Sequence, residues 1–336
     1  MIFITGGTGL VGSHILLKLT QKKVKFKALK RENSSLEICK DIFRHYKSEH
    51  LFNSIIWENG DVNDIPSLEH AMKDCDRIIH SAAIVSFHKE DAELLNKINV
   101  EGTRNIMNTA ISLGIKKVSY ISSIATLGGN NKTNEIINEE YYFKIDNKES
   151  NYALSKHYAE LEVWRASQEG IDVVISNPSL ILGPGDWKKG SSQIFNKIYR
   201  GLNYYTDGST GCVDVIDVAN CAILLLNSDI KNERFIINGE NIKYRDLFNL
   251  IADGFGKKRP NIKVTPFIKE IAWRVDYLIS IITGRKSLIT KESANSAMNK
   301  RMYSNEKIIK NIGYRFIPIQ ESINRYCKWF SKTSIQ

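Results

Sequence analysis

Short apolar runs alternate with amphipathic helical patterns through the first half of the chain. The apolar runs occupy residues 2–5, 24–29, 55–58, 77–80, 117–122 and 172–177. Helical patterns lie between them at residues 11–21, 65–73, 91–113 and 151–170. Strands that alternate with helices in this way form a parallel sheet covered by helices on both faces. Because crossovers between parallel strands are right-handed, the pattern predicts a doubly wound α/β fold.

The second half of the chain is less regular. Prolines and glycines at 178 and 183–185 interrupt it just after the sixth predicted strand. Further strands are expected at 213–216 and 234–238, and helical patterns cover residues 191–199, 218–227, 244–254, 266–283, 304–311 and 319–331. We expect the two later strands to return to the sheet of a main domain, residues 1–177. Residues 178–336 would mainly form a small α/β lobe that binds substrate.

A glycine-rich turn, T-G-G-T-G-L-V-G at residues 5–12, ends the first predicted strand and opens the first helix. In such a turn Gly6 allows an unusual φ, Gly9 lets the backbone approach a pyrophosphate, and Gly12 lets helix and strand pack closely. The anion would lie on free N–H groups at the positive end of the helix. The alternative is a purely structural glycine turn. We predict that a dinucleotide binds here, at Gly6, Thr8, Gly9, Leu10, Val11 and Gly12.

The ends of the next strands would hold the rest of the dinucleotide, because ligands bind such sheets at the carboxyl ends of the strands. Lys30 and Arg31 follow the second strand, where NAD-binding proteins usually place an acid, and a guanidinium suits the 2′-phosphate of NADP. Glu32 comes next, so NADP(H) is favoured and NAD(H) is the alternative. The residues expected to contact the cofactor after the third and fourth strands are Asp61, Val62, Ser81, Ala82 and Ala83.

Tyr152 and Lys156 are four residues apart within a predicted helix, so their side chains share one face of it. A lysine ammonium beside a phenol favours the phenolate, and we expect it to lower the pKa of Tyr152 towards neutrality. Ser123, after the fifth strand, could hydrogen-bond the oxygen of a substrate beside that phenol. Ser122 is expected to be structural. Together with the glycine turn, these residues predict nicotinamide-dependent redox chemistry at a carbonyl or alcohol.

The composition bears on the location of the protein and on the classes of partner that it binds. The chain has 336 residues and a net charge of +10, spread along its length in a way typical of a lysine-rich surface. Its five cysteines are scattered and form no C-x-x-C pair, which argues against a disulfide framework and against a zinc site. The reducing cytoplasm is the default location, and no metal site is expected. No nucleic-acid motif, secretory signal or integral membrane segment is evident. The apolar stretch 267–282 carries charges, and we expect an amphipathic helix packed on the fold, with a membrane-surface helix as the alternative.

Further motifs accompany these residues: H-S-A-A at 80–83, N-V-E-G-T at 99–103, S-S-I-A-T-L-G at 122–128, Y-A-L-S-K at 152–156, N-P-S-L-I-L-G-P-G-D at 177–186 and V-D-V-I-D-V-A at 213–219. With them the chain resembles the extended short-chain dehydrogenase/reductases, the NAD-dependent epimerase/dehydratase family, most specifically up to about residue 240. The resemblance implies a Rossmann fold, with Tyr152 as general acid/base and Lys156 bonded to the nicotinamide ribose. It also implies that Ser123 polarises the substrate oxygen, that Asn99 supports the active-site helix, and that Pro178 and Ser179 face the nicotinamide.

Departures from the family patterns suggest which branch of the family this chain resembles. Ser123-Ile124-Ala125 stands where dehydratases of the family carry Thr-Asp-Glu, which disfavours water elimination. Lys30 and the segment 177–183 depart from the epimerase pattern and look more like the branch of dihydroflavonol 4-reductase and 3β-hydroxysteroid dehydrogenase. We therefore expect an NADP(H)-dependent reductase or dehydrogenase for a ketone, aldehyde or secondary alcohol. The alternatives are an NAD-dependent nucleotide-sugar 4-epimerase and a non-catalytic NADP sensor, and the family implies a homodimer paired through residues 91–113 and 151–170.

Overall fold

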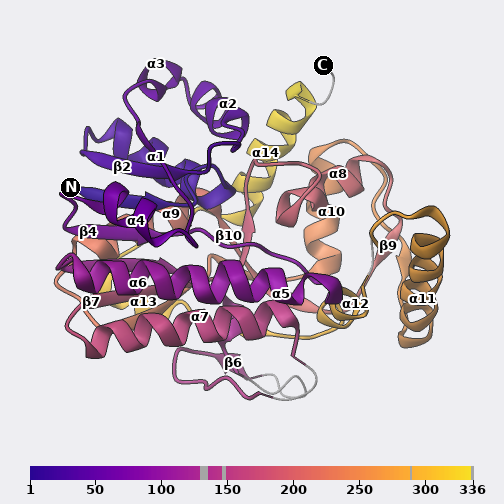
Figure 1. Ribbon diagram of the computed structural model, residues 1–336. Coiled ribbons are helices and arrows are strands. Elements are labelled where there is room, and N and C mark those ends of the chain that lie inside the picture. The colour runs from indigo at the N-terminus through magenta and orange to yellow at the C-terminus, as the bar shows by residue number, and fades with distance from the viewer. Residues whose placement is uncertain (129–134, 146–148, 288–289, 334–336) are drawn as a thin grey trace.

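The computed structural model describes residues 1–128, 135–145, 149–287 and 290–333, and its centre is a seven-stranded sheet (Figure 1). Every neighbouring pair of strands in this sheet is parallel. The spatial order is β11 (Glu233–Ile237), β7 (Asp172–Pro178), β5 (Lys117–Ile121), β4 (Arg77–His80), β1 (Ile2–Thr5), β2 (Phe26–Lys30) and β3 (Ile56–Asn59). The predicted doubly wound parallel sheet is confirmed.

Helices cover both faces of this sheet because successive strand residues point to opposite sides. Ile2 and Ile4 pack with Leu16 of α1 (Leu10–Gln21) in one apolar cluster, to which α9 (Val215–Asn227) also contributes. Phe3 packs with residues of α4 (Ile65–Met72), α6 (Gly102–Ser112) and α7 (Asn151–Gln168) in the other. In Figure 1, α6 and α7 run side by side along the lower part of the molecule.

The helix expected at 91–113 is one helical run that changes pitch in its middle. It consists of η1 (Lys89–Asp91), α5 (Ala92–Leu95), a π-helical segment η2 (Asn96–Glu101) and α6. Such π-helical insertions occur frequently at functional sites, and this one contains Asn99. Two helices after β2 were not expected, α2 (Glu37–His45) and α3 (Glu49–Phe52).

The second half contributes strands to the main sheet and to smaller separate sheets. The strand expected at 234–238 joins the main sheet as β11, beside β7. The strand expected at 213–216 does not: β10 (Ser209–Asp214) pairs with β8 (Leu180–Leu182) and β12 (Glu240–Lys243) in a separate sheet. The strand ends earlier than expected because the Asp214 side chain accepts a hydrogen bond from the Ile216 N–H at 2.8 Å and caps α9.

Most of the remaining elements build the lobe to the right and top of Figure 1, whereas α13 (Glu306–Ile312) is labelled on the left and β6 (Ile136–Ile137) at the bottom. The helices are η3 (Ile124–Thr126), η4 (Gly190–Ser192), α8 (Gln193–Tyr199), α10 (Tyr244–Gly254), α11 (Pro266–Thr283), α12 (Lys291–Ser296), α13 (Glu306–Ile312) and α14 (Ile319–Thr333). The short strand pairs are β9 (Tyr204–Tyr205) with β13 (Ile262–Lys263), and β6 (Ile136–Ile137) with β14 (Met302–Tyr303). Helix α11 leaves its apolar positions exposed rather than packed on the fold, contrary to expectation.

The lobe shares its core with the main sheet. One apolar cluster holds Ile4 of β1 together with Phe195 of α8 and Ile323 of α14. A buried polar centre ties the same elements together, since Asp214 at the end of β10 accepts hydrogen bonds from Ser322, Arg325 and Tyr326 of α14. The packed interior therefore continues across position 177, where the sequence suggested a change of domain.

Replacing Asp214 by alanine should test this centre. The variant leaves Arg325 without its buried carboxylate and α9 without its cap, so the free energy of unfolding should fall by roughly 3–5 kcal/mol. Urea unfolding followed by circular dichroism measures it. The matched control is Asp253→Ala, which removes a solvent-exposed ion pair with Arg259, and its loss should be much smaller. Equal losses in the two variants would contradict a stabilising role for the Asp214 centre.

Candidate active site

The glycine turn is shaped by close contacts that side chains would block. Gly6 has φ 73°, and a Cβ on it would lie 2.7 Å from the backbone of Ser81 and Ala82. A Cβ on Gly12 would lie 2.0 Å from the Gly6 carbonyl oxygen. At Gly9, by contrast, the nearest described atom would be that oxygen at 3.4 Å. Gly6 and Gly12 are thus required by packing, whereas Gly9 borders open space.

This turn fits the diphosphate of a dinucleotide. Gly9 is the N-cap of α1, and it has no side chain that could occupy the helix terminus. The N–H groups of Leu10 and Val11 in the first turn have no intrahelical acceptor and lie at the positive end of the helix dipole. Both residues and Thr8 are partly exposed. Backbone donors and open space therefore coincide at the predicted position.

A cavity of about 610 Å³ lies where β2 and β3 end. It is lined by Arg31, Glu32, Asn33, Asn59, Gly60, Asp61, Asp64 and Ser67. Lys30 Nζ instead donates a hydrogen bond to Asn59 Oδ1 at 2.6 Å. Val62 is buried and packs against Gly102. Of the two cations predicted to meet a 2′-phosphate, Arg31 is the one that lines the cavity, together with three carboxylates.

The end of β4 lies directly against the glycine turn. The Ser81 hydroxyl donates to the Thr5 carbonyl at 2.7 Å, and the Ala82 N–H donates to Thr5 Oγ1 at 3.2 Å. Ala83 follows and is exposed. His80 at the strand end is fully buried between the hydroxyls of Thr5 and Thr103, and burial lowers its pKa to about 3. It is therefore a neutral packing residue.

Asn99 connects this segment to the helix that carries the tyrosine. Its Oδ1 accepts from the Ile84 N–H at 2.9 Å, and its Nδ2 donates to the Ile84 carbonyl and to Ser155 Oγ at 3.1 and 3.0 Å. Ser155 precedes Lys156 on α7, and Asn99 is itself buried. The π-helical segment thus places one amide side chain between the loop after β4 and α7.

Tyr152 and Ser123 come together at the carboxyl edge of the sheet. Tyr152 lies in the first turn of α7, whose N-cap Ser150 accepts a hydrogen bond from the Ala153 N–H at 3.1 Å. Ser123 lies two residues beyond β5 in extended backbone. The Ser123 side chain, whose Oγ accepts a hydrogen bond from the Ala125 N–H at 3.1 Å, lies near the Tyr152 hydroxyl, and Phe87 packs edge-on against Tyr152 with ring centroids 5.8 Å apart. Two hydroxyls therefore lie beside each other at this edge.

Contrary to expectation, Lys156 does not contact the phenol of Tyr152. Its Nζ donates to the hydroxyl of Tyr120 at 2.6 Å and to the Ile121 carbonyl at 2.9 Å, both in β5. Burial lowers the pKa of Lys156 to about 7, and Glu160 opposes this shift. Burial likewise raises the pKa of Tyr152, and the nearby Ser123 hydroxyl opposes this shift. The expectation that the pKa of Tyr152 is lowered is therefore wrong for this arrangement, because burial outweighs the influence of neighbouring groups.

Glu160 is a residue of the site that the sequence analysis did not identify. It lies one turn beyond Lys156 on α7 and is buried. Its Oε2 accepts hydrogen bonds from Ser122 at 2.6 Å, from Thr126 at 2.9 Å and from Asn177 at 3.0 Å, and Arg234 of β11 lies 3.4 Å from its other oxygen. The sequence did contain a signal for this residue, because Glu160 follows Lys156 at the same four-residue spacing that separates Lys156 from Tyr152.

Pro178 and Ser179 lie at the end of β7 and are buried. The Ser179 N–H donates to the Ile237 carbonyl at 3.1 Å and its hydroxyl lies 3.4 Å from the same oxygen. These bonds join β7 to β11. A contact of Pro178 or Ser179 with the nicotinamide stays a prediction.

Comparison with known proteins places this geometry in a family. The sequence profile described as "NAD dependent epimerase/dehydratase family" matches residues 2–238. The chain belongs to this family. The match spans the glycine turn, Ser123, Tyr152 and Lys156, and it ends near the residue where the resemblance weakens. Members of the family are NAD(P)-dependent enzymes of the extended short-chain dehydrogenase/reductase type, and so is this protein.

Individual relatives within the family differ in their named activity. A putative dihydroflavonol 4-reductase of Synechocystis is 28% identical over 98% of this chain and 94% of its own length. A UDP-glucose 4-epimerase of Vibrio cholerae is 30% identical over 60% of this chain and 57% of its own length. Among solved structures, gox2253 superimposes with a TM-score of 0.81 at 28% identity, covering 99% of this chain and 98% of that one.

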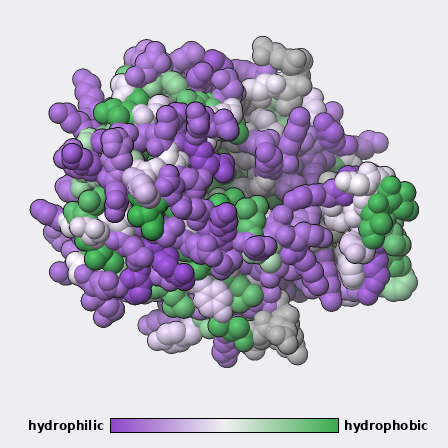
Figure 2. All heavy atoms as spheres, viewed as in Figure 1, coloured by the Kyte–Doolittle hydropathy of each residue, from purple (hydrophilic) through white to green (hydrophobic). Residues whose placement is uncertain are grey.

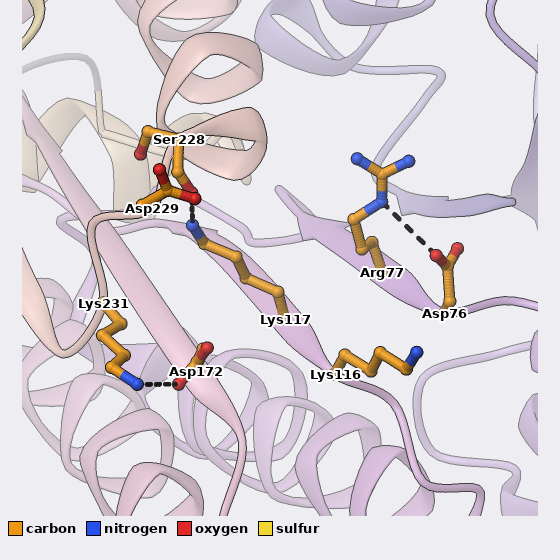
Figure 3. A pocket seen from close by; sticks show the side chains of 8 residues that line it. All are labelled: Asp76, Arg77, Lys116, Lys117, Asp172, Ser228, Asp229 and Lys231. Atoms are coloured by element: carbon orange, nitrogen blue, oxygen red, sulfur yellow. Dashed lines mark hydrogen bonds and ion pairs between the residues drawn. The ribbon is translucent and has the colours of Figure 1, made fainter.

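A second cavity, of about 430 Å³, lies at the opposite, amino-terminal edge of the sheet (Figure 3). Its charged lining is made of Asp76, Arg77, Lys116, Lys117, Asp172, Asp229 and Lys231. Lys117 donates to the Ser228 carbonyl, Lys231 pairs with Asp172 and Arg77 with Asp76. Family ligands bind at the carboxyl edge, so this cavity is not part of the active site.

From the burial of Lys156 we predict how the free energy of unfolding depends on pH. Between a folded pKa of about 7 and the ordinary value of 10.5, the unfolded chain holds the Lys156 proton and the folded protein does not. Raising the pH through this window therefore favours the folded state, by at most roughly 5 kcal/mol over the whole range. Urea unfolding at pH 6.5 and 9 should show a larger rise for the wild type than for Lys156→Met.

The control for this experiment is Lys97→Met, at an exposed position on the helix packed beside α7. It should keep the wild-type pH dependence. If wild type and Lys156→Met change in parallel between pH 6.5 and 9, then the lysine is not buried as the structure shows.

Proposed function

We propose that this protein transfers a hydride between NADP(H) and a ketone, an aldehyde or a secondary alcohol. The observation that carries the proposal is the placement of the Ser123 and Tyr152 hydroxyls near each other at the carboxyl edge of the sheet. Lys156 lies one turn along the same helix. Two hydroxyls that converge on one point can hold a carbonyl oxygen and stabilise the negative charge that develops on it.

Tyr152 is the proton donor in the direction of reduction. Because burial raises its pKa, the phenol keeps its proton through neutral pH. When the carbonyl carbon is reduced, its oxygen takes the Tyr152 proton and becomes a hydroxyl. In the direction of alcohol oxidation the phenolate must take that proton back, so oxidation should favour higher pH. Ser123 keeps the oxygen within reach of the phenol.

The dinucleotide would be held by the glycine turn, the segment 81–83 and the ends of β2 and β3. When bound, the nicotinamide supplies the hydride to the carbonyl carbon or accepts it from the alcohol. Lys156, a donor already at the edge of the sheet, would orient the ribose next to the nicotinamide. Asn99 would act through α7, by fixing the backbone around Ser155 and Lys156.

NADP(H) rather than NAD(H) is proposed on the position of Arg31. Its guanidinium lines the cavity at the ends of β2 and β3, where the adenosine of a dinucleotide would lie. A guanidinium binds phosphate through paired donors. Glu32, Asp61 and Asp64 line the same cavity and would repel a 2′-phosphate, so the proposed preference depends on this single arginine.

A nucleotide-sugar 4-epimerase is the second candidate, favoured by the identity of 30% to the epimerase of Vibrio cholerae. Epimerisation removes and returns a hydride at the same carbon, and so it needs a cofactor that stays bound. Denaturing the purified protein and identifying any released dinucleotide distinguishes the two. Stoichiometric NAD, together with turnover of a UDP-hexose, would replace the reductase proposal. A non-catalytic sensor is the least supported alternative, because Ser123, Tyr152 and Lys156 are all present.

The substrate pocket would be walled by the lobe, though its aromatic residues do not contribute equally. Phe195 is fully buried within the core, and Trp187 packs edge-on against it and Phe330. Tyr205 stacks with Arg245 on the surface, and Tyr204 is half exposed. The aromatic ring that contacts Tyr152 is Phe87, from the loop after β4. A substrate with an apolar group next to its carbonyl would pack against this ring.

We also propose a homodimer formed through α6 and α7. The two helices pack together and are linked by the Arg104–Glu162 ion pair at 2.9 Å. Leu161 and Tyr158 of α7 and Leu94 of α5 are 42–48% exposed. Large apolar side chains exposed on neighbouring helices are suited to a four-helix interface with a second copy.

The cytoplasm is the proposed location of the protein. All five cysteines are free thiols, and four of them are buried. Unpaired buried thiols are typical of proteins in a reducing compartment.

Replacing Tyr152 by phenylalanine tests the proposed acid. Turnover of a carbonyl substrate should fall by at least about 100-fold, because the proton donor is lost while the ring is kept. NADPH binding, measured by fluorescence titration, should change little. The control is Tyr142→Phe, an exposed tyrosine outside α7, with unchanged turnover. Wild-type turnover in Tyr152→Phe would remove this residue from the mechanism.

Replacing Arg31 by alanine tests the cofactor preference. Losing a guanidinium–phosphate contact should weaken NADPH binding by about 10- to 100-fold and leave NADH binding nearly unchanged. Isothermal titration with each cofactor measures both. Arg259→Ala, which removes a cation from the lobe surface, should alter neither. A parallel loss for both cofactors would show that Arg31 does not read the 2′-phosphate.

A further inference from the structure

Helix α11 presents an apolar stripe to the surroundings of the molecule. The stripe consists of Phe267, Ile271, Val275, Leu278 and Ile282, spaced by four, four, three and four residues, so all five share one helical face. Their exposed fractions lie between 47% and 82%. A surface helix of a globular protein normally turns such a stripe towards the core.

The inner side of α11 does not bury the apolar stripe, as the inner side of an ordinary surface helix would. Every residue of the helix is described, and the only buried one is Asp276. Its carboxylate accepts a hydrogen bond from Arg285 Nη2 at 2.6 Å. The buried position of this helix is thus taken by an ion-paired carboxylate, while the apolar stripe stays exposed.

Figure 2 shows hydrophobic side chains gathered at the right edge of the molecule, where Figure 1 places α11. Eight large apolar residues of this helix are exposed, and the stripe extends over its full length. No helix of the described residues is long and apolar enough to cross a membrane. The helix therefore suits a surface that it lies upon, not one that it spans.

The surroundings of the stripe are strongly basic. Residues 257–291 contain nine lysines and arginines and two acidic residues. This excess of seven positive charges makes up most of the net charge of +10 of the whole chain. The two acids are also engaged, Asp276 with Arg285 and Glu270 with Arg274 and Lys269. An apolar helical face within a cationic segment is the pattern of helices that lie in the interface of anionic bilayers.

We propose that α11 binds the surface of an anionic lipid bilayer, with the stripe in the acyl-chain boundary and the basic residues at the headgroups. A second copy of the chain would also cover apolar side chains, but the like charge of this segment would repel its own copy. Charge complementarity therefore favours an anionic membrane over self-association.

This surface lies near the catalytic helix. α12 follows α11 in the chain, and its Glu292 side chain lies near the backbone of Asn151, the residue before Tyr152. Lys286 pairs at 3.0 Å with Asp91, whose carboxylate also binds Ser86 at 2.6 Å. A bilayer under α11 would therefore lie on the side of the molecule where α7 begins. The inference concerns this docking and does not depend on the proposed reaction.

Vesicle sedimentation with the full-length protein tests the proposal. Wild type should sediment with vesicles of phosphatidylcholine and phosphatidylglycerol, and much less with phosphatidylcholine alone or at high salt. The double variant Ile271→Ser, Ile282→Ser should bind at least about tenfold more weakly, because two apolar contacts are lost at unchanged charge. The control, Ile56→Ser with Ile309→Ser, removes exposed isoleucines elsewhere and should bind like wild type.

Other results would overturn the proposal. Wild type that stays in solution with anionic vesicles, or a stripe variant that sediments as well as wild type, excludes membrane docking by this face. Light scattering after size exclusion provides the remaining outcome. If wild type forms an oligomer that the stripe variant does not form, and wild type does not bind vesicles, then a second copy covers α11. Circular dichroism confirms that both double variants are folded.

Discussion

The ammonium of Lys156, buried between α7 and β5, is the interaction on which the candidate site depends. It donates to the Ile121 carbonyl and to the Tyr120 hydroxyl at the end of β5, and so connects the helix to the last residues of the strand. Tyr152 lies one turn before it and Ser123 two residues beyond Ile121. Holding α7 against β5 therefore also holds the two hydroxyls together. The cost of burying this group appears in its pKa, which falls to about 7.

Around this contact, buried polar side chains join segments that are distant in sequence. Glu160 collects hydrogen bonds from the ends of β5 and β7, and Asn99 joins the loop after β4 to α7. Thr5 connects β1 to the end of β4. All these bonds lie at the carboxyl edge of the parallel sheet. Buried polar groups that satisfy one another fix one arrangement strongly, because each lost partner leaves another group unsatisfied.

The sequence was informative where chemistry depends on local spacing. The glycine turn, the strand ends and the pair Tyr152 and Lys156 could all be located from short patterns, because strand and helix periods fix which residues share an edge or a face. Partners across the fold could not. Whether Lys156 binds Tyr152 or Tyr120 depends on tertiary packing, and so does the sign of the pKa shift of Tyr152. The direction in which α11 turns its apolar stripe also depends on tertiary packing. Periodicity defines which residues share a helical face, but not what covers that face.

The most direct test of the account follows the hydride itself. The protein would be incubated with NADPH carrying deuterium at C4 of the nicotinamide and a panel of ketones and aldehydes, and the products analysed by mass spectrometry and NMR. The account predicts an alcohol with deuterium on the former carbonyl carbon, formed by wild type and hardly at all by Tyr152→Phe. If NADPH stays unoxidised with every carbonyl compound while the protein interconverts nucleotide sugars with a bound NAD, the account is contradicted.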